Sequence, residues 1–141
     1  MNASRKVAVI LGLALPMMAL AQESALPLAK SQGPVTYVTG GIGLDESTAL
    51  RQEQKNYPLS LLFTAGKRGA YVANVQVTVR NANGKVLLDS ASSGPIMLVR
   101  LPRGEYRVSA ELRGEAKQAS VKVPEKGTST LSFNWPSADA Y

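Results

Sequence analysis

The feature that most constrains this chain is a series of segments, from residue 59 onward, in which apolar and polar residues alternate. In one of them the apolar positions are Tyr106, Val108, Ala110 and Leu112, each separated from the next by one polar or charged residue. A period of two places the apolar side chains on one face of a β-strand and the polar ones on the other. The pattern therefore predicts strands that each cover a shared core with one face.

Turn signals separate these segments at short and regular intervals. Asn83-Gly84 supplies the positive φ angles of a tight hairpin, and Pro102–Gly104 and Pro124–Gly127 mark two further turns. Seven strands are expected between these turns, at residues 59–64, 71–80, 85–90, 95–101, 105–113, 118–123 and 131–135. Many short strands at such spacing predict an all-β fold, a seven-stranded antiparallel β-sandwich, over residues 59–136.

Residues 35–58 predict a strand–helix extension in front of the sandwich. The strand covers Val35 to Val38, and the helix runs from about Leu44 to Asn56. Acidic residues at 45 and 46 complement the positive end of the helix dipole, and Pro58 prevents the helix from continuing. The apolar face of this helix is thin, so we expect it to lie on the surface of something larger.

The N-terminal residues 1–21 have the pattern of a cleavable signal peptide. Arg5 and Lys6 precede an apolar stretch at 7–18, and Ala19-Leu20-Ala21 matches a small-x-small cleavage site before Gln22. The apolar stretch is too short to cross a bilayer as a helix, although an N-terminal membrane anchor is the alternative. The pattern predicts a periplasmic or secreted protein that does not span the membrane after cleavage, with residues 22–34 as a flexible leader.

The chain contains no histidine and no cysteine. This excludes Ser-His-Asp and Cys-His catalysis, histidine or cysteine zinc sites, haem ligation by these residues and iron–sulfur clusters. Gly40-Gly41-Ile42-Gly43 lacks the Lys-Ser/Thr ending of a phosphate-binding loop, and the acids that follow it disfavour a phosphate. We therefore expect no catalytic residues, no metal and no cofactor. The absence of disulfides fits a bacterial periplasm better than an animal extracellular fluid.

One motif resembles a known family. Gly94, Ile96, Leu98, Leu101-Pro102, Gly104 and Tyr106 are similar to the signature of the carboxypeptidase regulatory-like domain, a transthyretin-like β-sandwich. The resemblance implies a non-catalytic domain without the zinc peptidase, as in small secreted bacterial proteins that carry this domain alone. In physical terms, Pro102 fixes a turn, Gly104 adopts an angle that a side chain forbids, and Tyr106 fills the core with its hydroxyl at the rim.

Two functional classes remain open. In the first, the protein is a binding or accessory module for an envelope protein, a glycan or a peptidoglycan component. In the second, it is a structural or stress-related envelope component that assembles through its sheet edges. A concave aromatic patch would favour the first class, and Tyr37, Tyr57 and Tyr71 are the residues available to build one.

A basic patch is the candidate binding site. Arg100, Arg103 and Arg107 lie within eight residues around one turn, and guanidinium groups suit carboxylate or phosphate ligands. The alternative is that Glu105 and neighbouring acids neutralise the three arginines. The net charge of +6 falls to +4 once Arg5 and Lys6 are removed, and no basic run is interleaved with aromatic residues, so nucleic acid is not an expected partner. The oligomeric state does not follow from the sequence.

Overall fold

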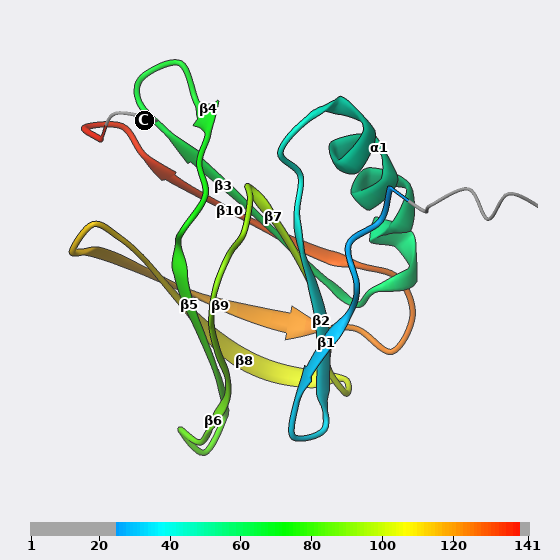
Figure 1. Cartoon of the computed structure of the whole chain (residues 1–141). Coiled ribbons are helices and arrows are strands. Elements are labelled where there is room, and N and C mark those ends of the chain that lie inside the picture. Colours follow the sequence, from blue (N-terminus) through cyan, green and yellow to red (C-terminus); the bar gives the residue numbers. More distant parts are fainter. Residues whose placement is uncertain (1–24, 139–141) are drawn as a thin grey trace, which may run out of the picture.

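Two β-sheets pack against each other around a shared core in the computed structural model, which describes residues 25–138 (Figure 1). The first sheet consists of β1 (Lys30–Gln32), β2 (Val35–Gly40), β3 (Leu59–Ala65), β4 (Ala70–Tyr71), β7 (Ile96–Arg100) and β10 (Ser129–Trp135). The second consists of β5 (Gln76–Asn81), β6 (Val86–Ala91), β8 (Gly104–Leu112) and β9 (Glu115–Val123). The predicted signal peptide lies outside the described residues.

The all-β sandwich class is confirmed, but the count and direction of the strands differ from the prediction. The strand order is β1-β2-β7-β3-β10 in the first sheet, with β4 paired to the end of β3, and β6-β5-β8-β9 in the second. The described chain thus has ten strands, whereas seven were predicted in the sandwich and one in the N-terminal extension. The pair β3–β10 is parallel, so the sandwich is not wholly antiparallel. A parallel pair needs a long crossover, which the strands of the second sheet supply between β3 and β10.

The N-terminal part of the chain is built into the first sheet. Residues 30–32, predicted as flexible leader, form β1 and pair with β2 around a turn in which Gly33 has φ +54°. The strand predicted at 35–38 does not lie outside the sandwich, because β2 pairs with β7 on its other side and buries Val35 and Tyr37 in the main core. Three residues are too few to show an alternation, which explains why β1 escaped prediction.

The helix agrees with its prediction. It forms as α1 (Leu44–Glu53) and continues as the 3-10 turn η1 (Gln54–Asn56), ending before Pro58. Its buried residue, Leu50, joins a second apolar cluster with Val38, Tyr57, Ile96 and Leu98. The helix therefore covers the outer face of the first sheet, as its thin apolar face led us to expect (Figure 1).

The predicted strand 71–80 is divided between the two sheets. Ala70–Tyr71 pair with β3 as β4, Asn74 adopts a left-handed φ of +62°, and the second-sheet strand β5 begins only at Gln76. Asn is one of the few residues that tolerate this conformation, which lets the chain change sheets. Tyr71 consequently lies outside the buried face of β5, with 43 % of its surface exposed.

Candidate functional site

The residues of the family-like motif have structural roles. Tyr106 is 8 % exposed, and its hydroxyl donates a hydrogen bond of 2.7 Å to the carbonyl oxygen of Pro102 in the turn between β7 and β8. Burial raises the pKa of Tyr106, so the phenol keeps its proton and remains a donor at neutral pH. Leu101 is buried in the main core beside it. This agrees with the prediction that Tyr106 is a core residue with its hydroxyl at the rim.

The three predicted arginines are divided between two neighbouring grooves. Arg100, at the end of β7, donates a hydrogen bond of 2.9 Å to the carbonyl of Asn56 and lies over the ring of Tyr57, 4.7 Å from its centroid. Arg103 forms an exposed ion pair of 3.4 Å with Glu125. Arg100 and Arg103 line one groove, whereas Arg107 lines another on the far side of the β7–β8 turn.

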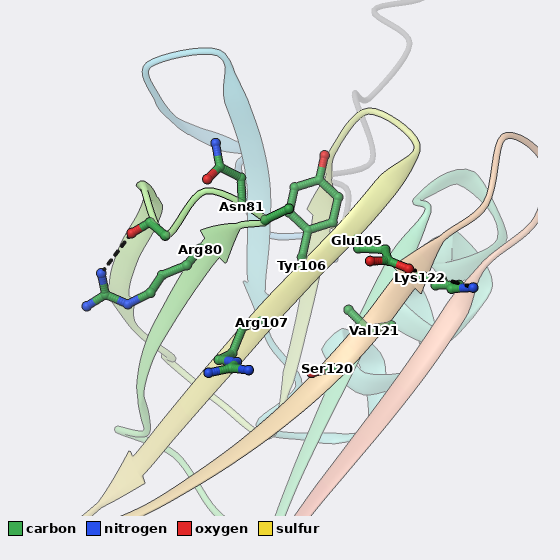
Figure 2. Close-up of a pocket in the computed structure, with 10 residues that line it drawn as sticks. Arg80, Asn81, Glu105, Tyr106, Arg107, Ser120, Val121 and Lys122 are labelled. Atoms are coloured by element: carbon green, nitrogen blue, oxygen red, sulfur yellow. Dashed lines mark hydrogen bonds and ion pairs between the residues drawn. The ribbon is translucent and has the colours of Figure 1, made fainter.

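Arg107 belongs to what we call the β8 groove, a hollow of about 590 Å³ at one end of the second sheet (Figure 2). The hairpin β5–β6, the start of β8 and the end of β9 line it, and Figure 2 shows how their side chains lie. The lining residues are Arg80, Asn81, Ala82, Gly84, Glu105, Tyr106, Arg107, Ser120, Val121 and Lys122.

Positive charge in the β8 groove is only partly neutralised. Arg80 and Arg107 occupy directly opposite positions on β5 and β8. The acid of the groove, Glu105, pairs with Lys122 across β8 and β9 at 3.7 Å. Arg80 donates to the carbonyl of Gly84 at 3.2 Å, and among the described residues the side chain of Arg107 has neither a hydrogen bond nor an ion pair. The groove therefore presents two guanidinium groups that no carboxylate satisfies.

Arg100 and Arg103 lie in what we call the η1 groove, about 490 Å³ in volume, between η1, the β7–β8 turn and the β9–β10 turn. Lys55 adds a third positive charge, and Glu125 adds the negative charge that pairs with Arg103. The prediction that neighbouring acids neutralise the arginines thus holds for Arg103, through Glu125 and not through Glu105.

The three tyrosines that were available to build an aromatic patch do not meet at the surface. Tyr37 and Tyr57 are buried, with 5 % and 7 % of their surfaces exposed, and only Tyr71 is accessible. Tyr71 accepts a hydrogen bond from Arg51 on α1, beside a hollow of about 420 Å³. The sequence of residues 35–38 did not reveal that Tyr37 would be buried in the main core. The position of Tyr57 directly after the helix likewise did not reveal that it would be buried in the second apolar cluster.

Specific side chains occupy part of the edges of the second sheet. The side-chain amide of Gln32 donates to the carbonyl of Asp89 and accepts from its N–H, both at 2.9 Å, and so occupies the edge of β6 as a neighbouring strand would. On the edge strand β9, Ser129 donates to the carbonyl of Lys122 at 2.6 Å and Trp135 donates to that of Glu115 at 2.9 Å. The edge strand β1 is only three residues long. Such features limit pairing with other chains.

Sequence reasoning missed Arg80 and Lys122, the partners of Arg107 and Glu105 in the β8 groove. Arg80 precedes Arg107 by a long stretch of chain, so proximity in sequence did not connect them. The signal was nevertheless present: Arg80 and Arg107 both lie at polar positions of the alternation, and the strands that carry them are neighbours in the sheet. Knowledge of the register between β5 and β8 would have placed Arg80 directly opposite Arg107.

Within residues 25–138, no group of three or more acidic residues lies close enough together to hold a metal ion. No helix in this part of the chain is long and apolar enough to cross a membrane. No family model matches the chain, and no curated protein matches it.

Proposed function

We propose that this protein is an exported, non-catalytic binding module, periplasmic or secreted, that recognises an anionic envelope component through the β8 groove. The observation that supports the proposal is the Arg80–Arg107 pair, two like charges directly opposite each other on neighbouring strands. Like-charged cross-strand pairs destabilise a sheet, so a bound anion that bridges them replaces a repulsion with two attractions. The absence of histidine and cysteine supports a role without catalysis.

Arginine suits this role because its guanidinium group presents several donors in one plane. A carboxylate or phosphate can accept two parallel hydrogen bonds from such a group, and this geometry also gives specificity. The hydrogen bond to Gly84 uses one nitrogen of Arg80 and holds its side chain in the groove. The other donors of Arg80, and those of Arg107, remain available to a ligand.

The resemblance to the carboxypeptidase regulatory-like domain agrees with this proposal, since that domain accompanies a catalytic unit and is not one itself. Fold analogy is nevertheless weaker support than the site. Assembly through sheet edges, the other functional class, has less support because side chains of Gln32, Ser129 and Trp135 already bond to edge backbone groups.

Nuclear magnetic resonance of the arginine side-chain N–H groups tests the proposal. Inorganic phosphate and galacturonic acid serve as minimal anionic probes, titrated at low salt. We expect the Nε–Hε signals of Arg80 and Arg107 to shift most, and the shifts to weaken as salt is added. The double variant Arg80→Gln/Arg107→Gln should abolish the saturable binding, whereas Arg68→Gln, an exposed change on the β3–β4 turn, should preserve it.

Equal shifts at all exposed arginines, or retained saturable binding by the double variant, would overturn the assignment of the β8 groove. Thermal unfolding of each variant provides the folding control. Since a variant that loses binding through unfolding would melt earlier, loss of binding by a variant whose melting temperature is not lowered reports on the site.

A further inference from the structure

The β8 groove and the η1 groove have the same set of charges. The β8 groove contains Arg80, Arg107, Lys122 and Glu105, and the η1 groove contains Arg100, Arg103, Lys55 and Glu125. Each set has two arginines, one lysine and one glutamate. In each groove the glutamate forms one ion pair, with Lys122 in the first and Arg103 in the second. Each groove thus has two more positive charges than negative ones.

The two grooves adjoin along a single cross-strand pair. Along the chain, a single residue separates the lining of one groove from that of the other at two places. These residues are Gly104, between Arg103 and Glu105, and Val123, between Lys122 and Pro124. Gly104 and Val123 are themselves register partners on β8 and β9. Residues two apart on a strand are separated by about 7 Å, so the walls of the two grooves lie within one such step of each other.

On the face of the sheet that carries Glu105 and Lys122, the ridge formed by this pair has no side chain of its own, whereas on the other face the ring of Tyr106 lies 3.7 Å from where a Cβ of Gly104 would be. Gly104 has none, and Val123 is 3 % exposed with its side chain in the main core. At φ +153°, Gly104 also has a backbone conformation that other residues rarely adopt, so the position favours glycine. An extended molecule can therefore pass from one groove to the other over the backbone of the ridge.

The charged groups on both sides are available to such a molecule. The carbonyl of Asn56 and the ring of Tyr57 hold Arg100 as the carbonyl of Gly84 holds Arg80, and in each case other guanidinium donors remain. The ion pair between Arg103 and Glu125 has side chains that are 74 % exposed on both partners, and exposed ion pairs contribute little to stability. A ligand anion can take the place of Glu125 at low cost.

We infer that the two grooves form one continuous site for a linear acidic glycan, a polysaccharide with carboxylates repeated along its chain, which crosses the Gly104–Val123 ridge. The inference rests on the proposed function and extends it from one anion to an extended ligand. A glycan fits better than an acidic protein because protein interfaces are anchored by exposed apolar or aromatic side chains. The large apolar side chains exposed in the described chain, Leu28, Ile42, Leu44, Tyr71 and Val86, line neither groove.

Calorimetric titration with galacturonic acid and with oligogalacturonides of increasing length tests the inference. Once one end of a long ligand is bound in the first groove, its other end is held at a high effective concentration near the second groove. We therefore expect the longest oligomer to bind at least about tenfold more tightly than a short one. The variant Arg100→Gln/Arg103→Gln should remove this gain and leave binding of the monomer to the β8 groove intact. Arg103→Gln alone serves as a second variant, because it does not disturb the contact of Arg100 with Tyr57.

The outcomes separate this inference from the proposed function. If the η1-groove variants bind the long oligomer as tightly as the unmodified protein does, the continuous site is refuted while the β8 groove still stands. If neither the monomer nor any oligomer shifts the signals of Arg80 and Arg107, the proposed function itself fails. If polyglutamate of equal charge binds more tightly than the oligogalacturonide, the partner is an acidic protein and the glycan assignment is wrong.

Discussion

Substitution of Gly94 by alanine tests the close contact that joins the end of β2 to the turn before β7. A Cβ at position 94 would lie 2.3 Å from the carbonyl oxygen of Gly40 and 2.4 Å from its carbon. Real Cβ atoms essentially never come within 3.0 Å of another heavy atom, so the two backbones would have to separate by about 0.7 Å. Both obstacles are backbone atoms of a paired strand, and neither can rotate away.

The cost of this separation follows from what holds the two segments together. Ser93 donates a backbone hydrogen bond of 3.2 Å to the hydroxyl of Thr39 and a side-chain hydrogen bond of 2.9 Å to its carbonyl. Overpacking costs about 1–3 kcal/mol, and each weakened hydrogen bond adds about 0.5–1.5 kcal/mol. We expect Gly94→Ala to lower the free energy of unfolding by roughly 3 kcal/mol, a large part of the 5–15 kcal/mol typical of a domain.

Urea and thermal unfolding followed by circular dichroism measure this change, and roughly 3 kcal/mol corresponds to a fall of about 10 °C in Tm. Gly40→Ala is the matched control, because a Cβ there would meet side chains and not backbone: Oε1 of Glu46 at 2.1 Å and, just inside the 3.0 Å limit, Cγ of Pro27 at 2.9 Å. The side chain of Glu46 can move away, losing its hydrogen bond to the N–H of Gly41, so we expect a loss of about 1 kcal/mol. A Tm for Gly94→Ala within 2 °C of the unmodified protein, on the order of 0.5 kcal/mol, would refute the contact.

Three further predictions concern ionisation, charge and processing. Since burial raises the pKa of Tyr106 in the folded state, its contribution to stability is complete below about pH 10, the pKa of an unfolded tyrosine, and is lost as the pH rises further. Tyr106→Phe should cost about 1 kcal/mol at pH 7 and make the alkaline loss shallower in urea titrations from pH 7 to 11. Arg107→Gln should stabilise the protein by about 0.2–1 kcal/mol at low salt and less at high salt, and a destabilised variant would contradict the repulsion with Arg80. Mass spectrometry of the exported protein should show Gln22 as its first residue, and an intact Met1 would exclude cleavage.

Much of the fold was predictable because the alternation in this chain is clean. The four apolar residues of β8, from Tyr106 to Leu112, are all buried. The turn at Asn83-Gly84 joins β5 and β6 as expected, although Gly84 has a positive φ and Asn83 does not. Helix α1 was predictable from its flanking signals, the early acids and Pro58. Gly94 was singled out by resemblance alone, and the contact with Gly40 supplies its physical reason.

The remaining features depend on contacts between distant parts of the chain. The alternation in β10 predicts a strand but not its parallel pairing with β3, since the period of two is the same in either direction. Short β1 has no pattern at all, because its position is fixed by pairing with β2. The division of the candidate residues between two grooves was unpredictable for a similar reason: Arg100, Arg103 and Arg107 are close in sequence, yet Arg107 lines the β8 groove and the other two line the η1 groove.

The position of the Arg80–Arg107 pair within the second sheet bears on whether it serves binding or is incidental. In the other described registers of this sheet no two like charges face each other: Thr78 faces Ser109, and Glu105 faces Lys122. The carboxylate of Asp89, on the edge strand β6, also has a hydrogen-bond partner, because the side-chain amide of Gln76 donates to it at 2.6 Å. The Arg80–Arg107 row is the like-charged pair among the described partners of β5 and β8. Like charges therefore face each other in this sheet only at the β8 groove. Such a local loss of stability is expected where a residue pair is retained for binding.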